Sequence, residues 1–299
     1  MNTARALPAA PRRPFPVAEV VRWFFLVLIV VTMLLPVCWM LLTSIKPLTE
    51  IFTKPYELWP ARVALTNYPD AWRAAPFARY FLNSAIVSVL ATIIQVFLCS
   101  LAGYAFARVP FTLRSACFAL VLGTFMVPTQ VTIVPLFIAL KYVPLTGGNS
   151  ISGAGGFGLL DSYAGLIAPH LISAFGIFLM RQFYVTLPSE LGDAARIDGA
   201  SEFGIFWRVF LPLTGPALAV LAVFVFQDTW NDFLWPLVIV KSDQMKTLQL
   251  ALSVFQQENT TQWTLLMAAT TFVTAPVVLL FVFAQRWLRQ GFAASGIKG

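Results

Sequence analysis

Residues 188–212 read PSELGDAARIDGASEFGIFWRVFLP, the longest polar-rich interruption between apolar segments in the second half of the chain. Glu190 and Asp193 follow a Pro-Ser helix start, where the positive end of the helix dipole favours acidic side chains. Asp198-Gly199 predicts a break, and Ser201 can cap a second helix. The stretch therefore predicts two short helices joined by a turn.

The first predicted helix has an apolar face that nothing in its own loop can bury. The face consists of small and aliphatic side chains: Leu191, Ala194, Ala195 and Ile197. An amphipathic helix held between apolar segments is expected to dock on another surface.

The composition identifies the chain as a polytopic membrane protein. Its 299 residues are 59% hydrophobic and 11% charged, whereas soluble domains carry roughly 25% charged residues. The net charge of +7 comes from basic residues in short flanks of apolar runs, a pattern of membrane topology and not of nucleic-acid binding. The three cysteines lie in apolar segments without CxxC spacing, and the single histidine, His170, has no second ligand nearby, so no metal site is expected.

Six segments have the length and apolarity of membrane-spanning helices. They are 20–45, 81–106, 115–140, 163–180, 213–240 and 265–283. The distribution of Lys and Arg favours both termini inside the cell. We therefore expect an all-α membrane protein with a cytoplasmic tail (1–19), a six-helix transmembrane domain (20–290) that includes the cytoplasmic loop 188–212, and a second cytoplasmic tail (291–299).

Polar residues inside the fifth segment suggest a pathway or a partner, because charges in a bilayer are costly. Asp228, Asn231 and Asp232 stand at i, i+3 and i+4, on one face of the predicted helix. They either line a solute path or form hydrogen bonds between helices. For Asp228 we favour a position that faces a cavity. The second segment has a small polar stripe, Ser84 to Cys99, that predicts close packing; Gln95 is its long central exception.

Nucleotide-binding motifs are missing or out of context. Residues 153–158 match GxGxxG, but no strand precedes them, so we do not expect a dinucleotide site. The sequence has no Gly-Lys pair of a phosphate loop, so any ATP that drives this protein must be hydrolysed by another subunit.

Residues 188–212 resemble the cytoplasmic loop of binding-protein-dependent ABC importer permeases. That loop reads EAA, three residues, Gly, nine residues, then Ile, any residue and Leu-Pro. The matching residues are Asp193-Ala194-Ala195, Gly199 and Val209-Phe210-Leu211-Pro212, with Asp in place of Glu and Val in place of Ile. Further stretches resemble the carbohydrate-uptake branch, and its maltose-type second permease in particular: 44–47, 66–68, 81–84, 103–108, 128–135, 195–200, 230–236 and 296–299.

The resemblance implies an ABC type I importer permease fold in the bacterial cytoplasmic (inner) membrane, multi-pass and surrounded by lipid. It implies a non-catalytic subunit without a cofactor of its own, which forms a heterodimer with a homologous second permease. Two ATP-binding subunits would use ATP and Mg²⁺, and an extracytoplasmic solute-binding protein would deliver a sugar or sugar-like solute. Di- or oligosaccharides, monosaccharide derivatives, polyols and glycerol-phosphate-type solutes stay open.

The resemblance also implies site residues. The ATPase-coupling residues would be Glu190, Asp193, Ala194, Ala195, Arg196, Asp198, Gly199, Ala200, Leu211 and Pro212. The binding-protein contact would be Ser253, Val254, Phe255 and Gln256, and the tail 291–299 would reach the ATPase. We assign the translocation path to Gln95, Asp228, Asn231 and Asp232.

Two other classes of protein remain for comparison. An ion- or proton-coupled secondary transporter would use Asp228 and Asp232 as a relay, but the spacing within 188–212 argues against it. A membrane-embedded hydrolase would need a nucleophile–base pair or a metal cluster, and a chain with one histidine and no HExxH motif offers neither.

Overall fold

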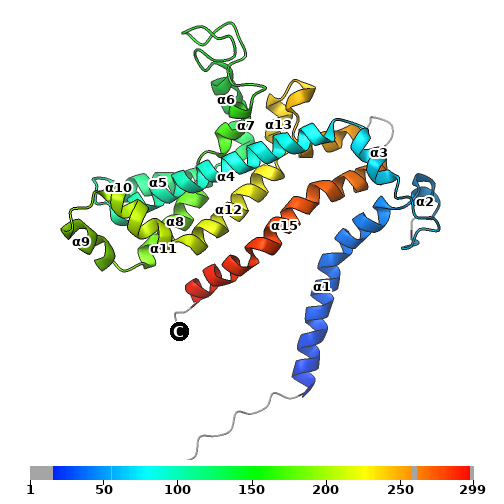
Figure 1. Ribbon diagram of the computed structural model, residues 1–299, viewed down its shortest axis with the longest axis horizontal. Helices are drawn as coiled ribbons and strands as arrows, with labels where there is room; N and C mark the ends of the chain where they lie inside the picture. The colour runs from blue at the N-terminus through cyan, green and yellow to red at the C-terminus, as the bar shows by residue number, and fades with distance from the viewer. Residues whose placement is uncertain (1–15, 55, 257–260, 297–299) are drawn as a thin grey trace, which may run out of the picture.

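The computed structural model describes residues 16–54, 56–256 and 261–296 (Figure 1). Its α-helices are α1 (Pro16–Ser44), α2 (Leu48–Thr53), α3 (Asn67–Arg73), α4 (Phe77–Arg108), α5 (Arg114–Phe125), α6 (Thr129–Lys141), α7 (Tyr163–Ile167), α8 (Ala174–Thr186), α9 (Glu190–Ile197), α10 (Glu202–Ile205), α11 (Leu211–Leu213), α12 (Gly215–Trp230), α13 (Leu234–Ile239), α14 (Leu248–Ala251) and α15 (Trp263–Gly296). The short turns are the 3₁₀ segments η1 (Ala168–His170), η3 (Asp243–Met245) and η4 (Leu252–Phe255) and the π-helical η2 (Phe206–Phe210). The described ranges contain no strand, so the predicted all-α class is confirmed.

Three helices are long and apolar enough to cross a membrane alone: 19–44, 77–108 and 263–286. Three bent helix pairs pass the same test, and counting each pair as one span gives the predicted six. These three spans are therefore not continuous helices. The pairs bend by 102° between α5 and α6, by 50° between η1 and α8, and by 83° between α11 and α12.

The bend between α5 and α6 has a local cause. Pro128 has extended backbone angles (φ −61°, ψ 134°) at the start of α6, and proline disfavours helix in the residue before it, so the predicted helix 115–140 is broken there. The helix predicted over 213–240 ends at Trp230 and resumes at Leu234. Asp228, Asn231 and Asp232 therefore do not share one helix face, because Asn231 is already the C-cap and Asp232 lies in the break.

The helix α4 is the centre of the bundle, with α8 and α12 packed along it. Its predicted polar stripe is buried except for the half-buried Thr92, and Gly103 allows α8 to approach closely, since a Cβ there would lie 2.7 Å from Cβ of Met180. Figure 1 shows α9 to α11 at one end of α4 and α2 and α3 at the other. The loops predicted to face opposite sides of the membrane thus lie at opposite ends of the bundle.

Candidate functional site

The loop 188–212 forms the predicted pair of helices. Helix α9 ends at Ile197 with Asp198 as its C-cap, and Gly199 takes a left-handed backbone (φ +80°). The N–H of Gly199 donates to the Arg196 carbonyl and the N–H of Ala200 to the Ala195 carbonyl, both at 3.0 Å. This is a Schellman ending. Ser201 caps α10, since its Oγ accepts from the N–H of Gly204 at 3.2 Å, as predicted.

Arg196 holds α9 and α10 together by ion pairs. Its guanidinium lies 2.8 Å from the Asp193 carboxylate and 2.7 Å from that of Glu202. Glu202 also accepts a hydrogen bond from the Tyr104 hydroxyl of α4 at 2.9 Å. The first acidic residue of the motif, Asp193, therefore makes its ion pair within the loop, where an aspartate is long enough to reach the third residue after it.

A second arginine fixes the entry and exit of the loop. The Arg108 guanidinium donates to the backbone carbonyls of Tyr184, at 3.1 Å from Nε, and of Leu187. It also lies over the Phe210 ring, 5.2 Å from its centroid. The end of α8 and the residues before α11 are thus tied to the end of α4, so a displacement of the loop reaches three helices of the bundle.

The predicted apolar face of α9 is divided in the structure. Ala195 packs on the buried cluster around Tyr104 and Phe206, whereas Leu191 stays exposed and Ile197 is 87% exposed. The other predicted coupling residues Glu190, Ala194, Asp198, Ala200 and Pro212 are also exposed, and Leu211 is half-buried. The loop therefore presents a preformed surface with an uncovered aliphatic side chain.

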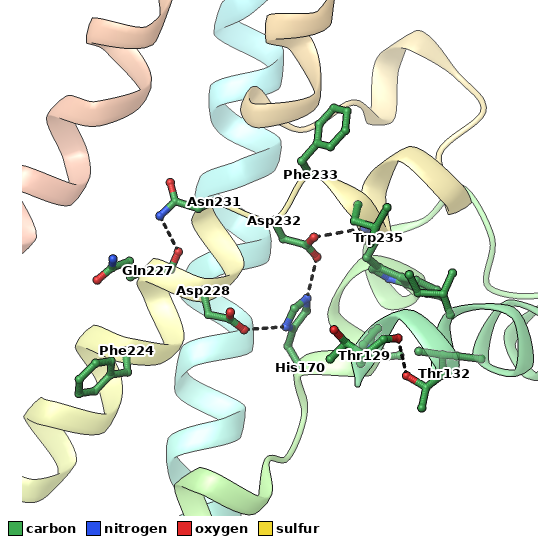
Figure 2. Close-up of a pocket in the computed structure, with 15 residues that line it drawn as sticks. Thr129, Thr132, His170, Phe224, Gln227, Asp228, Asn231, Asp232, Phe233 and Trp235 are labelled. Carbon is green, nitrogen blue, oxygen red and sulfur yellow. Dashed lines mark hydrogen bonds and ion pairs between the residues drawn. The ribbon is translucent and has the colours of Figure 1, made fainter. Parts of the chain in front are cut away.

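A cavity of about 920 Å³ lies where the broken helices meet, and Figure 2 shows the side chains around it. Its lining comes from α6, η1, α12, the 231–233 break and α13: Thr129, Thr132, Ile133, Leu136, Ala168, Pro169, His170, Phe224, Gln227, Asp228, Asn231, Asp232, Phe233, Leu234 and Trp235. The volume is within the ~300–1,000 Å³ range of small-molecule sites.

His170 connects the two carboxylates of the cavity (Figure 2). Its Nε2 lies 3.2 Å from Asp232, and its Nδ1 lies 3.8 Å from Asp228. Asp232 also accepts the backbone N–H of Trp235 at 3.2 Å and so caps α13. The Asp232 side chain is 18% exposed, whereas that of Asp228 is 80% exposed.

The structure separates the predicted path residues. Asp228, Asn231 and Asp232 line the cavity, but Gln95 does not, because it is buried and donates a 2.7 Å hydrogen bond to Ser173 Oγ. Sequence reasoning did not include His170 in this group. The sequence signal was a single histidine and two acids four residues apart, but their pairing depends on the break after Trp230 and the bend before α8, which apolar length and helical periodicity do not reveal.

The predicted binding-protein contact needs one correction. Ser253 and Gln256 are exposed and Val254 is half-buried, but Phe255 is buried and stacked on Phe77, with ring centroids 5.6 Å apart. Phe255 thus anchors the outer loop and offers no contact surface. Gln257, residues 1–15 of the N-terminal tail and residues 297–299 of the C-terminal tail lie outside the described residues, while residues 291–296 continue α15.

Comparison with known proteins shows the family. The model of the family "Binding-protein-dependent transport system inner membrane component" matches residues 95–293, and the chain belongs to this family. It is similar to the arabinooligosaccharides transport system permease protein AraQ of Bacillus subtilis (strain 168), with 32% identity over 95% of this chain and 98% of that protein. It is also similar to the sn-glycerol-3-phosphate transport system permease protein UgpE of Yersinia pestis, with 34% identity over 83% of this chain and 86% of that protein.

A solved structure shows the same fold. A bacterial ABC transporter that imports the acidic polysaccharide alginate matches with a TM-score of 0.77 and 20% identity, over 92% of this chain and 100% of that chain. Together, the fold and the family confirm a non-catalytic permease subunit of a binding-protein-dependent ABC importer in the inner membrane. They decide against the secondary transporter and the hydrolase.

Proposed function

We propose that this chain is one of two homologous permeases that form the membrane channel of an importer for a sugar or sugar-like solute. Two separate ATP-binding subunits bind ATP and Mg²⁺, and a solute-binding protein delivers the solute from outside. The relatives named above transport arabino-oligosaccharides and sn-glycerol 3-phosphate, which supports this class of solute.

The observation that carries the proposal is the preformed surface of residues 188–212. The loop holds its shape by its own contacts through Arg196 and Gly199, yet it leaves Ile197 almost fully exposed. Burial of an aliphatic side chain of this size contributes about 1.5–3 kcal/mol. A separate ATP-binding subunit that covers Ile197 would obtain this stabilisation without first ordering the loop.

The proposed coupling runs along one continuous piece of chain. Residues 202–213 of the loop turn by 83° at Thr214 into α12, which ends at the cavity. The 16 residues of α12 span about 24 Å at 1.5 Å per residue. Movement of the loop on closure of the ATP-binding subunits would displace α12 along this length and change the position of Asp228 relative to His170. The solute path would then alternate between two states whose balance ATP binding shifts.

Reconstitution into proteoliposomes tests the proposal. The complete importer should take up a radiolabelled sugar only when ATP is present on the side of the membrane that holds the ATP-binding subunits. The purified chain alone should hydrolyse no ATP and should accumulate no sugar when a proton or sodium gradient is imposed. Gradient-driven uptake by the chain alone would contradict the proposal and favour a secondary transporter.

A further inference from the structure

The cavity beside α12 carries a net negative charge. Two of the described lining residues are carboxylates, Asp228 and Asp232, and none is Lys or Arg. His170 is the one basic lining group, and even its protonated form would leave one negative charge uncompensated. Clefts lined by one sign of charge attract the opposite sign and repel the same sign.

The two carboxylates are not equivalent. Both Asp232 oxygens have partners within the chain, the N–H of Trp235 for one and Nε2 of His170 for the other. Asp228 has one described contact, with His170 at 3.8 Å, which is too long for a hydrogen bond. Asp228 therefore keeps its acceptor positions open toward the cavity, and His170, which is hydrogen-bonded to Asp232, lies beside it as its one described ion-pair partner.

The other lining residues suit the parts of a sugar that would not contact Asp228. Phe224 and Phe233 line the same cavity and expose aromatic surface, and Gln227 and Asn231 contribute amides. An ionised carboxylate only accepts hydrogen bonds, and bonds to charged groups are stronger than neutral ones. Sugar hydroxyls can donate to it, while an exposed aromatic ring covers the apolar C–H face of the sugar.

Resting on the proposed function, we infer that Asp228 is a specificity residue that selects uncharged polyhydroxylated solutes and rejects anionic ones. The carboxylate accepts hydroxyl hydrogens of a neutral sugar or polyol. A carboxylated or phosphorylated solute instead meets a like charge in a site without a described cation, which is discrimination by repulsion. The alginate importer and the glycerol-phosphate permease of the comparison act on anions, so this charge sets the chain apart from those two solute classes.

The first test measures ATP-driven uptake by the complete importer for matched probes. Glucose and glucuronate differ by one carboxylate, and arabinotriose and sn-glycerol 3-phosphate extend the comparison. We expect uptake of neutral probes only. Asp228→Asn should lower it about tenfold or more, as for loss of a hydrogen bond to a charged group, and Asp228→Glu should restore most of it. Asp70→Asn, an exposed acid on α3, is the matched control and should leave uptake unchanged.

The second test measures the cavity charge without a transported solute. A cysteine is placed at position 231 (Asn231→Cys) in an importer whose native cysteines are replaced, and its reaction rates with cationic and anionic methanethiosulfonate reagents are compared. Normalised to free thiol, the cationic reagent should react faster, and Asp228→Asn should reduce this preference. His170→Asn should also alter the preference, because it removes the basic side chain that lies 3.8 Å from Asp228.

The outcomes separate this inference from the proposed function. Anionic probes carried as fast as neutral ones, or unchanged neutral uptake in Asp228→Asn, would overturn the specificity role while the importer function stands. No ATP-driven uptake of any probe would contradict the proposed function. Even then, equal normalised reaction rates of the cationic and anionic reagents at position 231 would refute the negatively charged cavity.

Discussion

Replacement of Gly199 tests how the turn between α9 and α10 produces coupling. Its φ of +80° is the left-handed region, and a Cβ built there would meet nothing within 4 Å. Valine at this position therefore causes no clash within the chain and acts through the backbone alone. The left-handed conformation costs a residue with a Cβ roughly 1–2 kcal/mol, which lowers the population of the native turn about 5–30-fold.

The assay is co-purification of the ATP-binding subunit with the permease pair, together with the ratio of sugar taken up to ATP hydrolysed. Gly199→Val should weaken both by about 5–30-fold. Gly199→Asn is the matched control, because asparagine tolerates the left-handed region and should stay close to the wild type. Wild-type coupling in Gly199→Val would refute the backbone explanation. Equal loss in both variants would mean instead that the partner needs the open space at Gly199.

Three further predictions concern how the site is held in place. Arg108→Ala removes the bonds to the Tyr184 and Leu187 carbonyls; it should destabilise the importer by about 1.5–3 kcal/mol, read as a lower Tm, whereas the exposed Arg62→Ala should not. Gly103→Ala places a Cβ 2.7 Å from Cβ of Met180 and should cost about 1–3 kcal/mol by overpacking; Gly123→Ala, with nothing within 4 Å, should be neutral or stabilising. Burial raises the pKa of Asp161, but N–H donation from Ser242 and Lys241 outweighs it and holds the pKa below its usual range. The stabilisation that ionised Asp161 gives to the folded chain is therefore present above the unfolded pKa of about 3.9 and is lost as pH falls through the folded pKa. Proteolytic protection of the loop around Asp161, which these bonds tie to residues 241–242, should follow this course and be reduced at neutral pH in Asp161→Asn.

The features that the sequence predicted correctly depend on local chemistry. The turn of the loop follows from Asp198-Gly199, and the start of α10 follows from Ser201, because capping and left-handed glycine act over a few residues. The buried stripe of α4 follows from the spacing of small polar residues along one helix. Apolar length placed a predicted segment on each of the three long helices and on part of each of the three bent pairs, but not with the same bounds.

The features that it missed depend on contacts between distant segments. The break after Trp230 and the bend at Leu171–Ser173 together bring Asp232 within 3.2 Å of His170, 62 residues away in sequence. Periodicity assumes a continuous helix and therefore placed Asp232 on the face of Asp228. Phe255 was misassigned for a similar reason, because its stacking partner Phe77 comes from the start of α4.

The central claim, that residues 188–212 dock on an ATP-binding subunit, is tested most directly by the binding of that subunit to an importer carrying Ile197→Asp. Because Ile197 is 87% exposed, the fold and Tm should not change. Loss of a buried aliphatic contact of about 1.5–3 kcal/mol should weaken binding at least tenfold and reduce ATP-driven uptake in parallel. Val63→Asp, an exposed position outside this loop, is the control. Unchanged binding and uptake in Ile197→Asp would contradict the account.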